Sequence, residues 1–591
     1  MNKKNKLHLA TSGWMIEGLI LVAFLMVITA LVLPAWRSNQ LLIANDWSFH
    51  ASRVEEIYQN LKGGHFFTAI ATHTFHRTGV ANFLFYPTLF LYPWAAFRFF
   101  LSPSSAFYLW YSLISLATFE ISYHCAKKVT KTTFSAFVAA ICYGLMPYHL
   151  FTGRGVFGEF IAMTFLPVVL LGAYQLFFED ERKWMLLSIG MALVCYSHVL
   201  SVLMVSEVVA LLLVVSLIVN RGMTLARLKR LGYAIALALL LMVGQVAPFF
   251  TDYIGKGIFS TNAGLIYQQI SSPKHAIADA FNLTVGQSLG FILAMALFLG
   301  LVTIAMHNRQ ALVLWLLGAL LFIATTSAFP WQLIGKTPLG VIQFPYRYLS
   351  YAGIFLALLT GLAAEKLFTD PLQVPWQRGV KYLALLILAT SYAVISQVDG
   401  GSWGWWNNNQ MALPAPKKGA PVQPTPTSYK LSNKTHHRMF EYGVLYGEAD
   451  YYPKAARGVH QDAYFGGVVM DKKTASIING VAYLNGKKTK LSTTPGANQL
   501  TYRLSVKKKT TVNLPFLAYH NSFAKVDGKT VSYQASSRGT IQVNVSKGEH
   551  KITVGYHRPV AQKAALVVTL LTWLAIPFLR KRGRQTSFGK A

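Results

Sequence analysis

The densest group of chemically active side chains lies in the segment NDWSFHASR (residues 45–53), directly after the first apolar stretch. If this segment is helical, Asp46, His50 and Arg53 stand at i, i+4 and i+7 and share one face. A carboxylate beside His or Arg near a bilayer surface can act as a general base or hold a cation. Asp46 also suits the N-cap of a short amphipathic helix. Spacing alone favours the cap and leaves the catalytic interpretation open.

A second group of candidates lies in GRGVFGEF (residues 153–160). Glu159 stands at the start of a long apolar run, where a charge is costly and is therefore usually paired or functional. Arg154 is close enough in sequence to be its partner. The pattern fits a structural Arg154–Glu159 ion pair and a substrate-binding pair equally well.

Two further candidates stand near the ends of apolar runs. His198, in YSHVLS (residues 196–201), interrupts a run of apolar residues at its expected hairpin. A single histidine there is more often a turn residue than a proton carrier. Arg347, in QFPYRY (residues 343–348), precedes another run, where it can bind a lipid phosphate or extend to the membrane surface. The surrounding aromatic residues and proline favour phosphate binding.

The loop that follows the segment 45–53 carries His65, His73, His76 and Arg77. This basic cluster can bind phosphate or rest on anionic headgroups. His73 and His76 have helical metal-ligand spacing, but no third ligand is adjacent.

Composition places these residues in a membrane protein. The 591 residues are 53% hydrophobic and 13% charged, and the net charge is +32. Soluble domains carry roughly 25% charged residues. We predict a polytopic α-helical domain over residues 1–399, with a first outer loop at 37–82. Together with a last helix within 561–591, it would have about twelve crossings of some 20 residues each. The predicted spans are centred on 15–33, 105–125, 133–151, 158–178, 184–198, 199–219, 231–250, 288–306, 311–328, 348–364, 380–397 and 564–579.

Charge in the loops predicts orientation, because Lys and Arg collect on the cytoplasmic side. The basic loops at 127–131, 220–230 and 307–310 and the tail at 580–590 assign both termini to the cytoplasm. This distribution explains most of the positive charge and removes nucleic acid as a partner. The apolar segment 83–101 breaks the alternation if it spans, and its two prolines favour a re-entrant or interfacial helix.

The segment 400–560 changes character and is predicted to lie outside the cell. Short alternating runs separated by NG, PGAN, DG and KGE turns indicate a β-sandwich. Its Lys-rich stretches, such as 506–511, would meet anionic polymers in a Gram-positive envelope. The sequence has no Walker A loop, no GxGxxG after a strand and no HExxH, which argues against an ATP-driven pump.

Several motifs occur in an order that resembles a known family. They are ANDWSFHASRVEEI (44–57), NFLFYPTLFLYP (82–93), GRGVFGEFIAMTFLPVVLLG (153–172), YSHVLS and VIQFPYRYLSYAG (341–353). Together they resemble the bacterial integral membrane proteins filed under "6-pyruvoyl-tetrahydropterin synthase-related domain" and, more distantly, the YfhO-like membrane proteins. EADYYPKA (448–455) resembles the outer β domain of the YfhO-like group. The sequence offers no histidine arrangement like that of the soluble pterin synthases.

The resemblance implies a glycosyltransferase-C-like architecture and an enzyme that takes sugar from a polyprenyl-phosphate donor. It places the general base of the first outer loop at Asp46, with His50 assisting and Arg53 completing the motif. Arg154, Glu159, His198 and Arg347 match further motif positions, and we expect these four residues and Arg53 to bind substrate. The loop has Asn45-Asp46 in place of paired acids, so the use of a divalent metal is open, and no other cofactor is expected.

We therefore expect a membrane glycosyltransferase that acts on a cell-envelope polymer at the outer face, among membrane lipids. Two alternatives remain at this stage. In a lipid or polysaccharide transporter or flippase, the outer cluster would be a binding vestibule. In a non-catalytic envelope scaffold, the β domain would bind polysaccharide.

Overall fold

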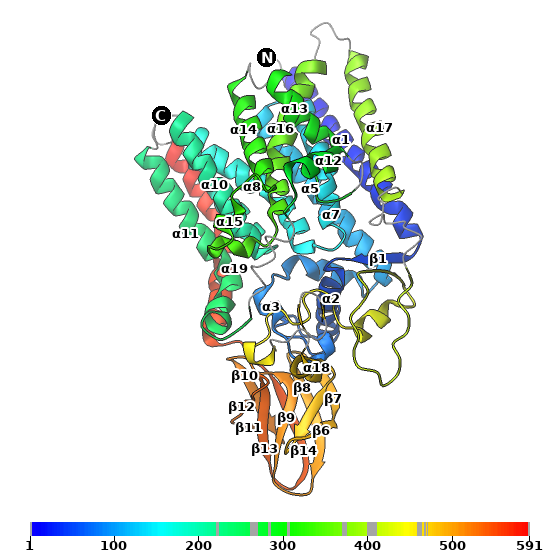
Figure 1. Cartoon of the computed structure of the whole chain (residues 1–591). Coiled ribbons are helices and arrows are strands. Elements are labelled where there is room, and N and C mark those ends of the chain that lie inside the picture. The colour runs from blue at the N-terminus through cyan, green and yellow to red at the C-terminus, as the bar shows by residue number, and fades with distance from the viewer. Residues whose placement is uncertain are drawn as a thin grey trace.

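The computed structural model describes residues 3–219, 224–259, 270–281, 285–303, 308–368, 375–398, 411–457, 464–465, 468–469 and 471–588. A bundle of helices forms one end of the molecule and a β-sandwich the other (Figure 1). Both termini lie at the end of the bundle opposite the sandwich, which we call the termini end. Between bundle and sandwich lies a layer of short helices and loops that includes α2 (Trp47–Lys62) and α3 (Asn82–Phe85).

Among the described residues, seven helical stretches are long and apolar enough to cross a membrane, which agrees with a multi-pass membrane protein. They are Gly13–Arg37 in α1 (Lys3–Arg37), Phe157–Phe178 (α8), Val199–Val219 (α10), Leu225–Tyr253 (α11, Leu225–Pro248, and the π-helical turn after it), Pro345–Phe368 (mostly α16, Leu349–Phe368), Gly379–Ser396 in α17 (Pro375–Val398) and Val560–Leu579 in α19 (Val560–Phe588). Shorter apolar helices cover Thr133–Gly144 (α6), Phe291–Val302 (α13) and Arg309–Ala324 (α14).

Each of the twelve predicted spans contains helix within the described residues, but not all of these helices have the expected length. Residues 304–306 of the predicted span 288–306 lie outside the described residues. The segment 133–151 divides into α6 and α7 (Pro147–Thr152), and 184–198 contains only the short helix α9 (Met185–Cys195). The helix α5 (Pro103–Thr130) is long, but it is not among the seven stretches because it is less apolar. The count of twelve crossings therefore remains a prediction.

Burial divides the helices into central and peripheral ones. The apolar window of α8 is 89% buried within the protein, whereas those of α10 and α19 are 28% and 22% buried. A helix that is apolar all round can be buried among other helices or face lipid. The helix α8 is therefore the centre of the bundle. The exposed leucine and valine side chains of α10 and α19 suit contact with hydrocarbon chains.

The segment 83–101 does not form a membrane-spanning helix. It contains the end of α3, a 3-10 turn at Leu89–Leu91 and the short helix α4 (Tyr92–Phe97), which packs on α2 and α5. Trp94 is buried and stacks on Trp110 of α5 at 5.0 Å. The prolines prevent one long helix, and the short pieces cover α2 instead.

The sandwich consists of two five-stranded sheets. One has the order β11-β10-β14-β8-β7 and the other β12-β13-β9-β5-β6, with all pairs antiparallel. The strands of the first sheet are β7 (Ser492–Gly496), β8 (Gln499–Val506), β10 (Ser522–Val526), β11 (Lys529–Val531) and β14 (Gly548–Tyr556). Those of the second are β5 (Val481–Leu484), β6 (Lys487–Lys490), β9 (Thr510–Leu517), β12 (Gln534–Ala535) and β13 (Thr540–Val545).

One run that reads as a strand is helical. The residues before β5 form α18 (Lys472–Ile478), because the Asp471 side chain accepts a hydrogen bond from the backbone N–H of Thr474 at 2.8 Å. This N-cap satisfies a free donor at the start of the helix and outweighs the β-propensity of Thr474, Ile477 and Ile478.

The segment 411–457 packs against the first outer loop rather than joining either sheet. Its strand β2 (Ser428–Ser432) pairs with β1 (Gln40–Ala44), the strand that follows α1. Below this pair, the Glu56 carboxylate accepts hydrogen bonds from the backbone of residues 72–74 and from the hydroxyls of Thr72 and Thr74. The outer loop is therefore a fixed platform.

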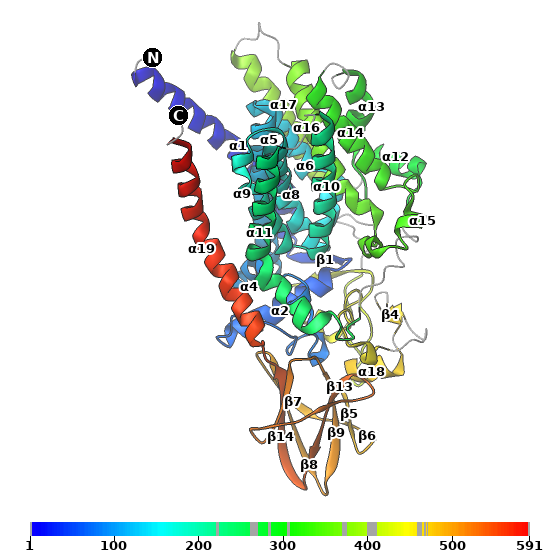
Figure 2. The same cartoon turned by 90° about the vertical axis from the view of Figure 1, so that its left-hand side faces the viewer.

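A buried carboxylate joins the sandwich to the bundle. Asp252, at the end of α11, accepts hydrogen bonds from Asn521 at 3.0 Å, Tyr556 at 2.8 Å and Gln562 at 2.9 Å. Gln562 lies on α19 (Val560–Phe588), which leaves the sandwich and runs beside the bundle (Figure 2). These contacts fix the sandwich relative to α11 and α19.

Candidate functional site

Asp46 stands at the N-cap of α2, but its side chain makes no capping hydrogen bond. The helix begins there as the N-cap pattern predicts, while the carboxylate remains half-buried and without a hydrogen bond among the described residues. Burial raises the pKa of Asp46 to about 6, Arg347 lowers it and Asp450 raises it by repulsion. The pKa of the Asp46 carboxyl group is therefore close to neutral pH.

Glycines of the segment 153–160 allow other chain segments to approach Asp46. A Cβ on Gly155 would lie 2.5 Å from the carbonyl oxygen of Ala44 and 3.3 Å from the backbone nitrogen of Asp46. A Cβ on Gly158 would lie 2.2 Å from the hydroxyl of Tyr86. The glycines of this motif therefore determine how closely the Asp46 backbone and the Tyr86 ring approach α8.

Glu159 forms its ion pair with Arg347 and not with Arg154. The Nε atom of Arg347 lies 3.5 Å from Oε2 of Glu159, with side chains 9% and 5% exposed. Oε1 of Glu159 accepts hydrogen bonds from Tyr148 at 2.8 Å and Ser350 at 3.1 Å. Two predicted site residues from distant parts of the sequence therefore meet in the protein interior.

Arg347 is held rigidly. Its Nη1 group donates to the carbonyl of Ile342 at 2.9 Å and to the side chain of Gln343 at 3.3 Å, and its guanidinium lies 5.0 Å from the Phe344 ring centroid. It also acts electrostatically on Asp46. Asp46, Glu159 and Arg347 therefore belong to one cluster of charges.

Arg154 does not belong to this cluster of charges. Its Nη2 group donates to the carbonyl of Ser396 near the end of α17 (Pro375–Val398) at 2.9 Å. Its guanidinium interacts with the hydroxyl groups of Tyr111 and Tyr392. Arg154 thus connects the turn before α8 to α17, and the structure does not bring it to Glu159.

His50 and Arg53 are completely buried beneath Asp46. Arg53 donates to the carbonyls of Tyr86 and Pro87 at 2.7 and 2.6 Å and lies over the Tyr86 ring. Burial, and secondly the charge of Arg53, lower the pKa of His50 well below its usual value. Arg53 therefore holds the 86–87 turn, and His50 is a neutral imidazole.

His198 lies close to this group. Its Nδ1 atom is 2.9 Å from Oγ of Ser201, and its ring lies 5.8 Å from that of Tyr86. The Nε2 atom of His50 is buried without a hydrogen-bond partner in the part of the chain described. Both histidines therefore contact the Tyr86 ring, since the ring of His50 lies 5.5 Å from it.

Two site residues were not predicted from the sequence. The Tyr86 hydroxyl interacts with the charges of Arg53, Asp46, Arg347 and Glu159, which places it within the cluster. Asp450 is half-buried, and burial raises its pKa to about 6 although Arg457 lowers it. Asp450 precedes Tyr451, a non-glycine residue at φ 66°.

The strained backbone beside Asp450 marks it as a candidate, since such conformations gather at functional sites. Its sequence signal is the EADYYPKA motif, which resembles the outer β domain of the YfhO-like group. Tyr86 likewise lies in the 82–93 motif, whose apolar character drew attention to the membrane instead.

The predicted basic cluster of the outer loop contacts the sandwich side of the molecule. Phe75, His76 and Arg77 all have positive φ, in a 3-10 turn. His76 Nδ1 lies 3.1 Å from Glu448, and Arg77 donates to Thr493 at 2.9 Å. Within the described ranges, no three His, Cys, Asp or Glu side chains gather as ligands of one metal ion.

No protein-family model and no curated protein matches the sequence, so the resemblance to the pterin-synthase-related and YfhO-like groups stays a prediction. Comparison with solved structures finds ArnT from Cupriavidus metallidurans bound to undecaprenyl phosphate. The match has 15% identity and a TM-score of 0.38, and it covers 66% of this chain and 65% of ArnT. The mycobacterial arabinofuranosyltransferase AftD matches with 17% identity and a TM-score of 0.36, over 65% of this chain and 26% of its own. Similarities of this size do not establish an activity for this chain.

Proposed function

We propose that the protein is a membrane glycosyltransferase of glycosyltransferase-C-like architecture that transfers a sugar from a polyprenyl-phosphate donor to a cell-envelope acceptor. The observation that carries the proposal is the half-buried Asp46 carboxylate. It has no hydrogen bond among the described residues and lies within electrostatic reach of the rigid cation Arg347. A free base beside a fixed cation suits a reaction in which a hydroxyl attacks and a phosphate leaves.

In this proposal Asp46 accepts the proton of the acceptor hydroxyl. The hydroxyl oxygen then bonds to the anomeric carbon of the sugar, and the bond from that carbon to the phosphate oxygen breaks. A base works best when its pKa lies near the working pH, and burial raises that of Asp46 to about 6.

Arg347 would stabilise the negative charge that develops on the leaving polyprenyl phosphate. Its Nη1 group is occupied by Ile342 and Gln343, whereas its Nη2 group has no hydrogen bond within the described residues. Glu159 would hold the guanidinium in place as a positioning residue. A preorganised cation stabilises the transition state without rearranging during the reaction.

The two histidines and Tyr86 complete the proposed site. Neutral His50, whose Nε2 atom is buried, would assist by supporting the Tyr86 ring from within the protein, and His198 and Tyr86 would form the wall of the acceptor site. Arg53 would support this wall rather than bind substrate, because its donors are used by the 86–87 turn. Arg154 would have the structural role seen at α17.

The proposed orientation places the sandwich on the outer face. Its support is that the lysines at 127, 128, 131 and 183 line one recess together with Glu17 of α1, the helix that begins near the N-terminus, and such residues collect on the cytoplasmic side. Both termini would then be cytoplasmic, and the Asp46 cluster would face the envelope.

The test is the substitution Asp46→Asn, which keeps size and N-cap capacity but removes the base. Cells that depend on the protein would carry wild type, Asp46→Asn or the control Glu549→Gln, which removes an exposed carboxylate from β14. We expect Asp46→Asn to abolish the sugar added to the envelope at unchanged membrane levels, and Glu549→Gln to preserve it. Unchanged envelope sugar in Asp46→Asn cells would refute the proposal.

A further inference from the structure

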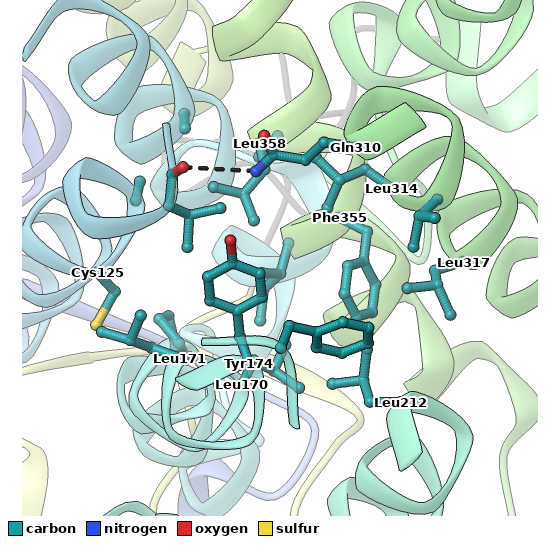
Figure 3. A pocket seen from close by; sticks show the side chains of 18 of the residues that line it. Cys125, Leu170, Leu171, Tyr174, Leu212, Gln310, Leu314, Leu317, Phe355 and Leu358 are labelled. Carbon is teal, nitrogen blue, oxygen red and sulfur yellow. Dashed lines mark hydrogen bonds between the residues drawn. The ribbon is translucent and has the colours of Figure 1, made fainter. Parts of the chain in front are cut away.

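A separate cavity lies within the helical bundle, toward the termini end. It has a volume of about 350 Å³ and is lined by α5, α6, α8, α10, α14 and α16. Figure 3 shows side chains of the lining around the space, among them Leu171 of α8, Leu212 of α10, Leu317 of α14 and Phe355 of α16. Most of the lining side chains are apolar, so an apolar occupant is favoured.

The lining also includes polar side chains, among them Ser122, Tyr174, Arg309 and Gln310. Arg309 and Gln310 stand together at the start of α14. Gln310 donates to the carbonyl of Val129 at 3.5 Å, the hydrogen bond drawn in Figure 3, and Arg309 donates to that of Val219 at 3.1 Å. Both carbonyls lie at the C-terminal ends of helices, α10 and α5, where a carbonyl group has no hydrogen-bond partner within its own helix. The two side chains supply these missing partners.

Arg309 makes this hydrogen bond and also lies at the surface of the protein. Its side chain is exposed, and the described part of the chain gives it no carboxylate partner. Lys131 nearby on α5 is paired with Glu179 at 3.0 Å. Arg309 therefore leaves a positive charge at the rim of an apolar cavity.

More positive charge lies on another face of the same end of α5. A second recess there is lined by His124, Lys127, Lys128, Lys131, Lys183 and a single acid, Glu17. Lys127 is paired with Glu17. The termini end of the bundle as a whole would attract an anionic headgroup.

We propose that the cavity binds one hydrocarbon chain of an anionic membrane lipid whose headgroup contacts Arg309. The apolar lining suits a hydrocarbon chain, and the single cation at the rim matches a phosphate. The site lies at the opposite end of the bundle from Asp46, so it is distinct from the proposed donor site and does not depend on the proposed function. The lipid would bridge α5, α8 and α14 and stabilise the bundle in proportion to its concentration.

The experiment uses the full-length protein in nanodiscs with a phosphatidylglycerol that carries a photoreactive group near the end of one chain. A phosphatidylcholine with the same chain is the neutral probe. We expect phosphatidylglycerol to label α8 and α14 within the cavity. Labelling confined to lipid-facing side chains such as Leu316, which is 51% exposed, would overturn the proposal.

Two variants reduce the cavity from different helices, Leu171→Trp on α8 and Ala126→Phe on α5, so failure of one to fold leaves the other. Each should lower cavity labelling about tenfold, equivalent to about 1.4 kcal/mol. The matched control Leu316→Trp, on the exposed side of α14, should leave it unchanged. Equal labelling in folded cavity variants and control would refute the site.

The variant Arg309→Gln tests the headgroup separately. It should remove the preference for phosphatidylglycerol over phosphatidylcholine while both probes still label the cavity. An unchanged preference would show that Arg309 does not bind the headgroup and would overturn that part of the proposal. Envelope sugar transfer does not enter any of these measurements, so they remain interpretable if the proposed function fails.

Discussion

Arg347→Met perturbs the centre of the candidate site, because it removes one member of the buried Arg347–Glu159 pair. The Glu159 carboxylate would keep its hydrogen bonds from Tyr148 and Ser350 but lose the only cation paired with it among the described residues. Breaking a buried pair from one side costs about 3–5 kcal/mol, since an uncompensated charge remains. We expect a loss of this size in the free energy of unfolding.

A second substitution should recover part of this loss. In the double variant Arg347→Met/Glu159→Gln, the amide oxygen can still accept from Tyr148 and Ser350, but no charge is buried. We expect a coupling of about 1–3 kcal/mol between the two substitutions. The double variant should therefore be more stable than the sum of the single effects indicates.

The stability measurement is denaturant unfolding of purified protein in detergent, followed by tryptophan fluorescence. The matched control is Lys131→Met, which breaks a pair whose side chains are 65% and 26% exposed. Exposed pairs contribute only about 0–1 kcal/mol. If Arg347→Met costs no more than Lys131→Met, the reasoning about the buried pair is wrong.

The same variants separate stability from function. If Arg347 binds donor phosphate, the double variant should remain inactive in envelope sugar transfer although its stability is partly restored. Recovery of transfer together with stability would contradict the phosphate role and leave Arg347 as a structural residue.

Two further predictions concern Asp46. Gly155→Ala would place a Cβ 2.5 Å from the Ala44 carbonyl oxygen, so we expect about 1–3 kcal/mol of destabilisation. The control Gly232→Ala, which meets nothing within 4 Å inside a helix, should stabilise by about 0.5–1 kcal/mol in the same unfolding assay. Equal effects of the two substitutions would show that the close approach at Gly155 is unimportant. With an Asp46 pKa of about 6, the ionised fraction rises from roughly a tenth at pH 5 to nine tenths at pH 7, so transfer should rise about tenfold between them. Asp450→Asn removes a charge that raises the pKa of Asp46, so the rise in transfer should move to lower pH. A pH profile identical to wild type would contradict the coupling between Asp450 and Asp46. Because the folded pKa of Asp46 lies above its ordinary 3.8, this group should also make the protein less stable as the pH rises from about 4 to 6.

Local sequence patterns determined much of the architecture. Apolar runs placed the helices, since a segment that must satisfy its backbone hydrogen bonds in lipid becomes helical. Alternation and turn signals placed most strands of the sandwich. Asp46 before an amphipathic run predicted the start of α2, although its side chain makes no capping hydrogen bond in the structure. At α18, the residue pattern predicted a strand, but the N-cap at Asp471 stabilises a helix instead.

Only the tertiary structure decided which distant side chains meet. A charge at the start of α8 is costly, which indicated that Glu159 is paired. Proximity in the sequence suggested Arg154 as its partner, but in the structure Glu159 pairs with Arg347 and Arg154 contacts α17. Asp450 reaches Asp46 because β1 and β2 pair across most of the chain length and fix the segment 411–457 on the outer loop. Periodicity and capping are set by neighbours a few residues apart, so a sequence displays them directly. The environment of a charge depends on which segments pack around it, and that is determined by the fold as a whole.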